Sequence, residues 1–346
     1  MKAFVDSTQA GQRRDEASPS PSLLEVRDLC VELAAIAGAQ ALRGVTLGVA
    51  KGEVVGLVGE SGCGKTTTAL VILRLLSSQF RVVSGVISFA GLDLLTMSEH
   101  DMRDLRGGRI AMIFQDPLRH LNPVFTVADQ LSMVVRTHVR GLTSREVRAR
   151  GLELLAQVRI SDPERCMRSY PHQLSGGMAQ RVMIAMALSG SPELLLADEP
   201  TAALDVTVQA EVLRLLRAIA RERQMAMLFI SHNLGAVWQL CDRVYVMYAG
   251  QVVEAASSTT LFSQPEHPYS RALLDAVPHL QVEQTLLASI PGAAPSVTDM
   301  PAGCAFHPRC AYAQDKCRAT VPPPVSLGAP AERREARCLF AGALPD

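Results

Sequence analysis

The chain is poor in lysine, in aromatic residues and in net charge, and each shortage excludes something. Lys+Arg and Asp+Glu both number 34, so the formal net charge is zero. No overall field therefore draws the protein to nucleic acid or anionic lipid. Aromatic residues make up only 4% of the 346 residues, whereas hydrophobic residues make up 48%. That hydrophobic content supports a folded core and excludes disorder over the bulk of the chain.

Long apolar runs are also absent. No stretch approaches the roughly 18 consecutive apolar residues of a membrane span. Residues 1–21 are polar and lack the apolar run of a secretory signal, so we expect a disordered leader there, with no evident role. On this interpretation the chain stays in the cytoplasm, where structural disulfides are rare, and its eight cysteines need another explanation.

Short apolar runs alternate with helical patterns through most of the chain. Buried strands are predicted at Gly52–Gly59, Leu194–Ala197 and Met225–Ile230, and helices at Thr66–Leu76 and Val208–Arg223. Two further strand-like runs, Leu23–Val31 and Leu42–Val49, precede them. Alternation of this kind predicts an α/β fold with a largely parallel sheet.

Two segments depart from the alternation. Residues 118–190 read as mostly helical, and after about Glu266 proline becomes dense and four cysteines fall within 35 residues. We expect residues 266–346 to form a small Pro/Cys-rich extension that cannot build a core unaided. No internal repeat is visible, which predicts a single nucleotide-type domain at 22–265.

Gly59–Thr66 reads GESGCGKT and matches G-x-x-x-x-G-K-[ST], between a predicted strand and a predicted helix. In this motif, backbone N–H groups and the helix N-terminus hold phosphates, the lysine reaches the β/γ-phosphates and the last hydroxyl binds Mg²⁺. The segment predicts binding of ATP or GTP. The residues expected to contact the nucleotide are Gly59, Ser61, Gly62, Gly64, Lys65, Thr66 and Thr67.

A second element of the same chemistry follows the strand at Leu194–Ala197. Asp198 comes at its carboxyl end, where an open α/β sheet binds its ligand, and is expected to hold Mg²⁺. Glu199, beside it, is placed to polarise an attacking water. Taken alone, this Asp-Glu pair is a weak signal, because a solvated turn has the same composition.

Four further motifs complete a pattern that resembles the ABC-type ATPases over about residues 22–255. They are Leu174-Ser175-Gly176-Gly177-Met178-Ala179-Gln180, Gln115-Asp116-Pro117, Ala203-Leu204-Asp205 and Ser231-His232-Asn233. The resemblance implies a P-loop NTPase with a RecA-like core, an antiparallel β subdomain and a helical signature subdomain at about 117–190. It also implies hydrolysis of ATP to ADP and phosphate.

The resemblance assigns roles to these motifs. Ser175 and Gly177 would form a second anion cradle before a helix, on the lobe opposite the phosphate-binding loop, so two ATPase domains would meet head-to-tail around ATP. Asp205 would line the same interface. His232 would contact the γ-phosphate, and Gln115 would contact Mg²⁺ and the lytic water while sensing the partner.

One position departs from the family pattern. Members usually offer an aromatic residue near the first strand to stack on adenine, whereas this chain has aliphatic Leu33 at the corresponding position. Base stacking is then weaker or supplied elsewhere, which leaves the preference for ATP over GTP open.

Flanking segments resemble one subgroup, the oligopeptide/dipeptide importers, over about residues 22–340. The matching segments are Leu121-Asn122-Pro123, Tyr170-Pro171-His172, His267-Pro268-Tyr269-Ser270-Arg271, Ile290-Pro291-Gly292 and the tail from Pro301 to Cys310. The resemblance implies an ATPase subunit that powers peptide import. It would lie peripherally on the cytoplasmic face of the cell membrane, beneath two membrane-spanning permease subunits served by an extracytoplasmic substrate-binding protein.

Several alternatives stay open at this point. The second ATPase is either another copy or, as the subgroup commonly has it, a related chain in a heterodimer. Relatives also import nickel or glutathione. A soluble ABC ATPase acting on nucleic acid or ribosomes is disfavoured by the single domain and the zero net charge, so we expect no nucleic-acid partner. A non-hydrolysing nucleotide-binding module is disfavoured because Glu199 and His232 are both present.

The tail cysteines Cys304, Cys310, Cys317 and Cys338 are separated by 5, 6 and 20 residues. No C-x-x-C pair is present, so a usual zinc ribbon is excluded. Four thiolates suit an iron–sulfur cluster or Zn²⁺. The alternative is that the cysteines are free or disulfide-bonded and bind no metal. Members of the resembled subgroup can carry a four-iron–four-sulfur cluster at such cysteines, which we expect here as a structural clamp.

Overall fold

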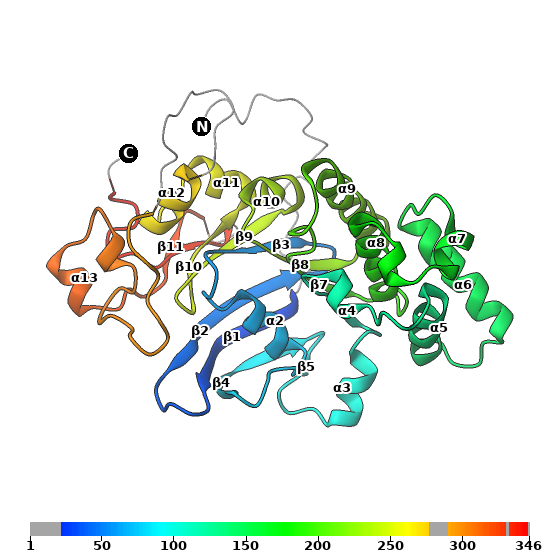
Figure 1. Cartoon of the computed structure of the whole chain (residues 1–346). Helices are drawn as coiled ribbons and strands as arrows, with labels where there is room; N and C mark the ends of the chain where they lie inside the picture. The colour runs from blue at the N-terminus through cyan, green and yellow to red at the C-terminus, as the bar shows by residue number, and fades with distance from the viewer. Residues whose placement is uncertain (1–21, 277–289, 330–331, 345–346) are drawn as a thin grey trace.

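The computed structural model describes residues 22–276, 290–329 and 332–344. The leader expected at residues 1–21 lies outside the described residues. Two sheets organise the described chain, with helices above the larger sheet and a separate group of helices at one side (Figure 1). Within the described part, no helix is both long and apolar enough to cross a membrane.

The larger sheet has the order β11-β12-β10-β9-β3-β8-β7-β6. Its parallel part, which carries the site, comprises β9 (Arg243–Tyr248), β3 (Val54–Val58), β8 (Ala226–Ser231), β7 (Leu194–Asp198) and β6 (Ile110–Ile113). Strands β10 (Gln251–Ser257), β12 (Arg334–Ala336) and β11 (Val325–Leu327) extend it antiparallel. The predicted α/β fold with a largely parallel sheet is confirmed.

The two faces of this sheet bury two different cores, because successive side chains of a strand point to opposite faces. In β8, Met227 and Phe229 join one core, whereas Ala226 and Leu228 join the other. The same alternation divides the residues of β7. Strands buried on both faces have no polar side, which explains their uninterrupted apolar runs in the sequence.

The smaller sheet is antiparallel, with the order β2-β1-β4-β5, and packs under the larger one together with α2 (Lys65–Ile72) (Figure 1). Its strands are β1 (Ser22–Leu33), β2 (Gln40–Ala50), β4 (Phe80–Phe89) and β5 (Leu92–Asp93), and α3 (Glu99–Leu105) follows. The opposite face is covered by α9 (Val206–Arg223), α10 (Leu234–Leu240), α11 (Ser258–Ser263) and α12 (Pro268–Asp275).

Between β6 and β7 the chain forms the group of helices at the side of the molecule (Figure 1). It contains α4 (Pro117–His120), α5 (Val127–His138), α6 (Ser144–Gln157), α7 (Pro163–Arg168), a short 3₁₀ turn at Pro171–Gln173 and α8 (Gly176–Ala187). Helices α5 and α6 both begin at a capping box, with Thr126 and Thr143 as N-caps.

The C-terminal segment does not fold apart from the rest. Strand β12 pairs with β10, and Phe306 is buried in the same core as β8. Between them lie a 3₁₀ turn at His307–Arg309 and α13 (Asp315–Ala319). The segment therefore adds to an existing core instead of building its own.

Helix α2 is shorter than its sequence pattern predicted. The expected span was Thr66–Leu76, but the helix covers Lys65–Ile72. Arg74 has a left-handed φ of 52°, which a helix cannot continue through. Its guanidinium donates 2.6 Å to the carbonyl oxygen of Met97, so a tertiary contact supports the turn that ends the helix.

Candidate functional site

The phosphate-binding loop, residues 59–66, joins the carboxyl end of β3 to the start of α2. Its conformation needs glycine at two positions. A Cβ on Gly59, where φ is 152°, would lie 2.1 Å from the carbonyl oxygen of Met247, and one on Gly64, at φ 106°, would lie 2.6 Å from Leu42 Cδ2. The buried Lys65 Nζ donates to the carbonyl oxygens of Gly59 at 2.8 Å and Glu60 at 2.9 Å. The loop is thus a preformed turn with its cation at the centre.

Asp198 ends β7, which is separated from β3 by β8 alone. Its side chain is 4% exposed, and Oδ1 has no hydrogen-bond partner among the described residues. Burial raises the pKa of this carboxyl, and a hydrogen bond from Thr66 opposes that rise. A buried carboxylate oxygen without a donor is costly unless a cation neutralises it, so Asp198 and Thr66 fit a Mg²⁺ site.

The carboxylate of Glu199 contacts the side chains of the two other predicted catalytic residues, Gln115 and His232. Gln115 Nε2 donates to Glu199 Oε2 at 3.0 Å, and His232 Nδ1 lies 3.0 Å from Glu199 Oε1. The three residues follow β6, β7 and β8, whose parallel carboxyl ends meet at one edge of the sheet. Tertiary structure thereby brings to Glu199 one residue 84 positions before it and another 33 positions after it.

The backbone of Glu199 is strained. Its φ is 45°, in the left-handed region that a non-glycine residue adopts at a cost, and its N–H donates 2.9 Å to the carbonyl oxygen of Ile230. Strained backbone of this kind persists where its surroundings hold it, and it gathers at functional sites. Here it aims the carboxylate at Gln115 and His232.

The remaining predicted nucleotide contacts lie at the starts of two helices. Ser175 caps α8 and accepts the N–H of Met178 at 3.3 Å, and Asp205 caps α9 and accepts the N–H of Val208 at 3.0 Å. Within the described chain, no hydrogen bond joins Ser175 or Gly177 to residues 59–66. A Cβ on Gly177 would lie 2.7 Å from Val208 Cγ1, so these two helix starts face each other instead.

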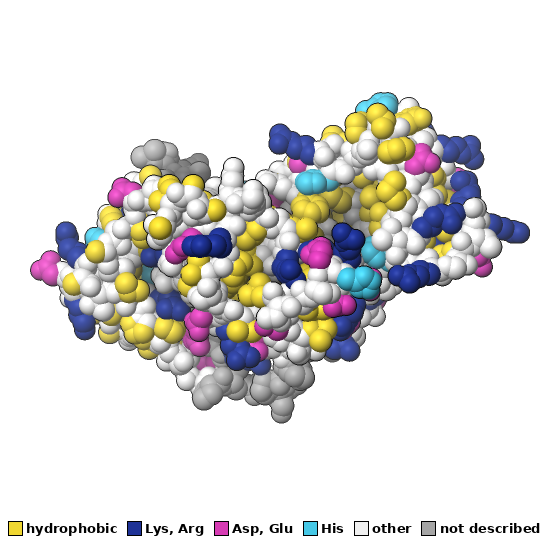
Figure 2. Space-filling model, turned by 90° about the horizontal axis from the view of Figure 1, so that it is seen from below, with side chains coloured by type: hydrophobic (Ala, Val, Ile, Leu, Met, Phe, Trp, Pro, Cys, Tyr) yellow, Lys and Arg dark blue, Asp and Glu magenta, His cyan; other side chains and the backbone are white. Residues whose placement is uncertain are grey.

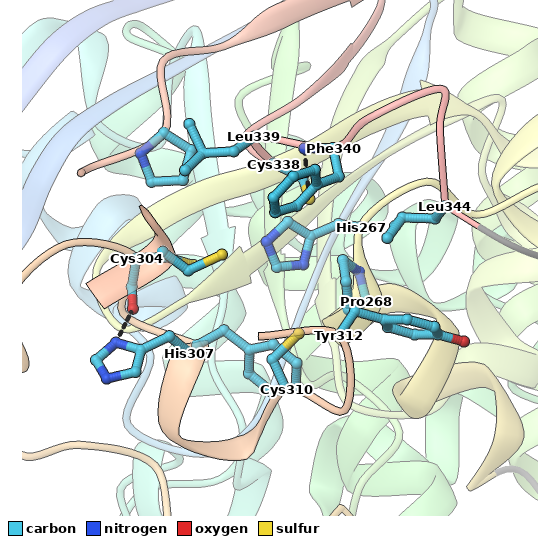
Figure 3. Close-up of a pocket in the computed structure, with 13 residues that line it drawn as sticks. His267, Pro268, Cys304, His307, Cys310, Tyr312, Cys338, Leu339, Phe340 and Leu344 are labelled. Atoms are coloured by element: carbon cyan, nitrogen blue, oxygen red, sulfur yellow. Dashed lines mark hydrogen bonds between the residues drawn. The ribbon is translucent and has the colours of Figure 1, made fainter. Parts of the chain in front are cut away.

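All four tail cysteines line one pocket, together with His267, Phe306, His307 and Phe340. Figure 3 shows the sulfur atoms of Cys304, Cys310 and Cys338 pointing toward a common centre. Burial raises the pKa of Cys304 and Cys338, and that of Cys310 to about 11. The eight cysteines are all free, which excludes the disulfide alternative for this structure.

The pocket is not a ready-made site for a single ion. Among the described residues, no three His, Cys, Asp or Glu side chains lie close enough to hold one metal ion. Four thiolates around one Zn²⁺ would lie within about 4 Å of one another, because Zn–S bonds are about 2.3 Å long. A four-iron cluster is larger than a single ion and holds its four thiolates further apart than Zn²⁺ does.

The backbone of the tail supports this arrangement. Gly303 has φ 68°, and a Cβ there would lie 2.4 Å from the carbonyl oxygen of Cys317. The adjacent N–H of Cys304 donates 2.8 Å to that same oxygen. A glycine before the first cysteine therefore lets two cysteine-bearing segments approach closely.

One group of contacts was not foreseen from the sequence. Glu60, inside the phosphate-binding loop, accepts two hydrogen bonds from Arg309, 249 residues away, and its backbone N–H donates 2.8 Å to the hydroxyl of Tyr269. Both partners stand in segments that the subgroup resemblance had marked, but nothing in their local pattern indicates what they contact. Leu33, at the end of β1, pairs with Phe80 of β4, and its effect on base recognition stays a prediction.

Comparisons with known proteins agree with this geometry. The family model described as ABC transporter matches residues 42–202, and that described as oligopeptide/dipeptide transporter, C-terminal region, matches residues 253–317. A probable peptide ABC transporter ATP-binding protein of Sinorhizobium fredii is 50% identical over 89% of this chain and 93% of its own. The dipeptide transport ATP-binding protein DppD of Escherichia coli is 46% identical over 86% of this chain and 89% of its own.

Solved structures give the same assignment. A dimeric, post-hydrolysis ATP-binding cassette, MJ0796, bound to ADP and Pi, is 26% identical with a TM-score of 0.61, covering 68% of this chain and 98% of that one. CbiO1 of Clostridium perfringens, part of an ABC transporter complex, is 28% identical with a TM-score of 0.62, covering 70% of this chain and 91% of that one. The chain has the P-loop ATPase fold of these proteins and belongs to the ATP-binding proteins of ABC transporters that carry the oligopeptide/dipeptide transporter C-terminal region.

Proposed function

We propose that this chain hydrolyses ATP to power the import of di- and oligopeptides through an ABC transporter of the cell membrane. The observation that carries the ATPase is the convergence of Gln115 and His232 on Glu199, beside the phosphate-binding loop. The names of the relatives support the cargo class, because they are peptide and dipeptide transport proteins. Nothing in the structure favours nickel or glutathione over peptides.

In the proposed reaction, residues 59–67 would hold the phosphates and Thr66 and Asp198 would hold Mg²⁺, which would supply charge neutralisation there. Glu199 orients and polarises the attacking water, while Gln115 and His232 fix its carboxylate and His232 faces the γ-phosphate. Phosphoryl transfer of this type depends mainly on positioning and charge neutralisation. The three side chains supply positioning because each leaves a different strand of one rigid sheet.

We propose that Ser175, Gly177 and Asp205 contact the ATP held by a second ATPase subunit. The separation of α8 from the same chain's phosphate-binding loop supports this, as does the dimeric form of the similar cassette. A related but different chain is our preferred partner, which makes the pair a heterodimer. We assign residues 22–265 to the ATPase domain and 266–346 to the C-terminal region.

A surface for the permease subunits is available on the group of helices at 117–190. Large apolar side chains are exposed there at Leu118, Val124, Phe125, Met133 and Tyr170, with Val124 70% exposed. Figure 2 shows yellow side chains on this part of the molecule, rimmed by arginine. Exposed apolar side chains gathered in one region mark an interaction surface. We propose that it binds the permease on the cytoplasmic face of the membrane, which makes the chain peripheral.

We further propose that Cys304, Cys310, Cys317 and Cys338 hold a four-iron–four-sulfur cluster. Their convergence on one pocket supports it, and the guanidinium of Arg43 lies close enough to Cys304 to favour the thiolate form that binds iron. Zn²⁺ is the weaker alternative because of the spacing described above. Anaerobic purification with iron and sulfide analysis tests it: about four irons and a broad band near about 400 nm support the cluster, and colourless iron-free protein refutes it.

The import function is tested in a transporter reconstituted from this chain, its ATPase partner, the permeases and the binding protein. Peptide uptake should require ATP, and Val124→Asp should abolish uptake while the isolated chain keeps its ATPase activity. Val83→Asp, at a 48% exposed apolar residue of β4, is the matched control and should transport normally. Uptake of nickel or glutathione, but not of peptides, would refute the proposed cargo.

A further inference from the structure

Glu60 connects the phosphate-binding loop to the C-terminal region through its carboxylate and its backbone N–H. Its carboxylate accepts from Arg309 Nη1 at 2.7 Å and Nη2 at 2.9 Å. Its N–H donates to the Tyr269 hydroxyl at 2.8 Å, and its carbonyl oxygen accepts from Lys65 Nζ at 2.9 Å. One loop residue therefore links the phosphate-binding lysine to two residues that lie more than 200 positions later.

Arg309 is itself held rigidly. Its side chain is 6% exposed, and Nε donates 2.8 Å to the carbonyl oxygen of Pro291. Nη1, which donates to Glu60, also lies 3.3 Å from the hydroxyl of Tyr248, at the end of β9. The hydrogen bond to Glu60 raises the pKa of the guanidinium, so it stays charged. A bidentate pair of this kind fixes direction as well as distance, because the planar fork matches the carboxylate.

The same short segment reaches the cysteine pocket. Arg309 immediately precedes Cys310 and belongs to the 3₁₀ turn at His307–Arg309. Three residues before it, Phe306 packs edge-on against Tyr248, with ring centroids 5.2 Å apart, and against Tyr269, at 5.4 Å. Phe306 also lines the pocket. Displacement of residues 304–310 would thus move both groups that hold Glu60.

We propose that Arg309 is a positioning residue for ATP: it fixes Glu60, and through it the loop and Lys65, in the geometry that binds phosphates. It also transmits the state of the cysteine pocket to the nucleotide site. The first half needs only the ATPase, whereas the second rests on the cluster proposed above. A buried ion pair is by itself weak evidence of a gain in folding stability. At this position the pair would instead hold the phosphate-binding loop in one conformation.

The first experiment measures KM for MgATP and kcat in the full chain for Arg309→Met, Glu60→Gln and the double variant. We expect each single variant to raise KM about tenfold, within the usual range of coupling between sites, with kcat changed less than threefold. The double variant should be no worse than either single one, because both remove the same link. Arg309→Lys should restore part of the affinity, since it keeps the charge and loses the fork.

Arg318→Met is the matched control, because Arg318 is a 69% exposed arginine of the same region. Thermal unfolding of every variant identifies any variant that does not fold. If Arg309→Met does not fold, Glu60→Gln is the decisive variant, since it replaces one carboxylate oxygen by an amide nitrogen and leaves Arg309 in place. Unchanged KM in folded Arg309→Met and Glu60→Gln, or independent additive effects, would overturn the positioning role.

The second experiment compares iron-loaded protein with protein stripped of iron by a chelator. Wild type should lose ATP affinity on stripping, whereas Glu60→Gln should show the same raised KM in both forms. Equal KM for loaded and stripped wild type would overturn the transmission. Protein purified without iron would overturn the cluster and the transmission together, while the variants of the first experiment would still decide the role of Arg309.

Discussion

Replacing Glu199 by glutamine tests the catalytic arrangement most directly. Both carboxylate oxygens of Glu199 accept a contact, one from Gln115 and one from His232, each at 3.0 Å. In Glu199→Gln the amide oxygen can still accept from Gln115, whereas the amide nitrogen can only donate, so a contact with His232 Nδ1 requires that nitrogen to be the acceptor of the imidazole. The variant also loses the negative charge that polarises water. The strained backbone at φ 45° tolerates either side chain equally, so the fold should be unaffected.

The expected loss of kcat follows from the role of Glu199 as the general base. A positioned general base contributes about 10²–10⁴-fold to a rate, which at about 1.36 kcal/mol per decade corresponds to about 2.7–5.4 kcal/mol of barrier. We therefore expect kcat to fall by that factor in Glu199→Gln. Affinity for MgATP should stay within threefold, because among the described residues Glu199 makes no hydrogen bond to residues 59–66. ATP-bound ATPase dimers should accumulate, because binding continues and hydrolysis does not.

Phosphate release and equilibrium nucleotide binding, with size-exclusion chromatography in ATP, measure these effects. Glu222→Gln, at an exposed glutamate in the last turn of α9, is the control and should behave as wild type. If His232 acts only through Glu199, adding His232→Ala to Glu199→Gln should slow the reaction no further, since residues that act as a unit are non-additive. Hydrolysis by Glu199→Gln within threefold of wild type would refute the assigned role.

Three further substitutions test the frame around the site. Gly59→Ala would place a Cβ 2.1 Å from a backbone oxygen of β9, so we expect about 3 kcal/mol lower stability and no measurable ATP binding; normal melting would contradict the close packing. Gly303→Ala, with its Cβ 2.4 Å from a backbone oxygen, should lower the iron bound per chain, and full iron content would show that the pocket does not need this approach. Arg243→Met would leave the largely buried Glu53 without the cation that now lies 2.9 Å away, so denaturant unfolding should show a loss of about 3–5 kcal/mol; a loss under about 1 kcal/mol would mean the pair is not fully desolvated.

Much of this protein is readable from its sequence because the relevant physics is local. The turn at Gly59–Thr66 requires glycine where φ is positive, and a lysine and a hydroxyl at fixed offsets. The sequence motif therefore specifies the conformation of the loop almost completely. Buried parallel strands such as Leu194–Asp198 are apolar on both faces, so they stand out as short continuous runs. The family resemblance extended this reading to Gln115 and His232.

The early end of α2 was not readable, because helix propensity continues past Ile72. The helix ends at the left-handed turn of Arg74, and this turn is supported by a contact of its guanidinium with the carbonyl oxygen of Met97, on another segment. The fate of the C-terminal segment was likewise undecided. Its density of proline predicts little regular structure, but pairing between β12 and β10 depends on an edge that only the folded sheet provides.

Tertiary structure alone brought Arg309 to Glu60 and aimed the sulfur atoms of the tail at one pocket. A salt bridge between residues 249 positions apart leaves no periodicity or spacing in the chain, because its geometry depends on how the tail packs against β9 and α12. Cysteine spacing singles out the four proposed ligands but does not give the distances between them, which depend on backbone turns such as that at Gly303. The local motif thus specifies what binds phosphate, and the packing of distant segments specifies what holds that motif in place.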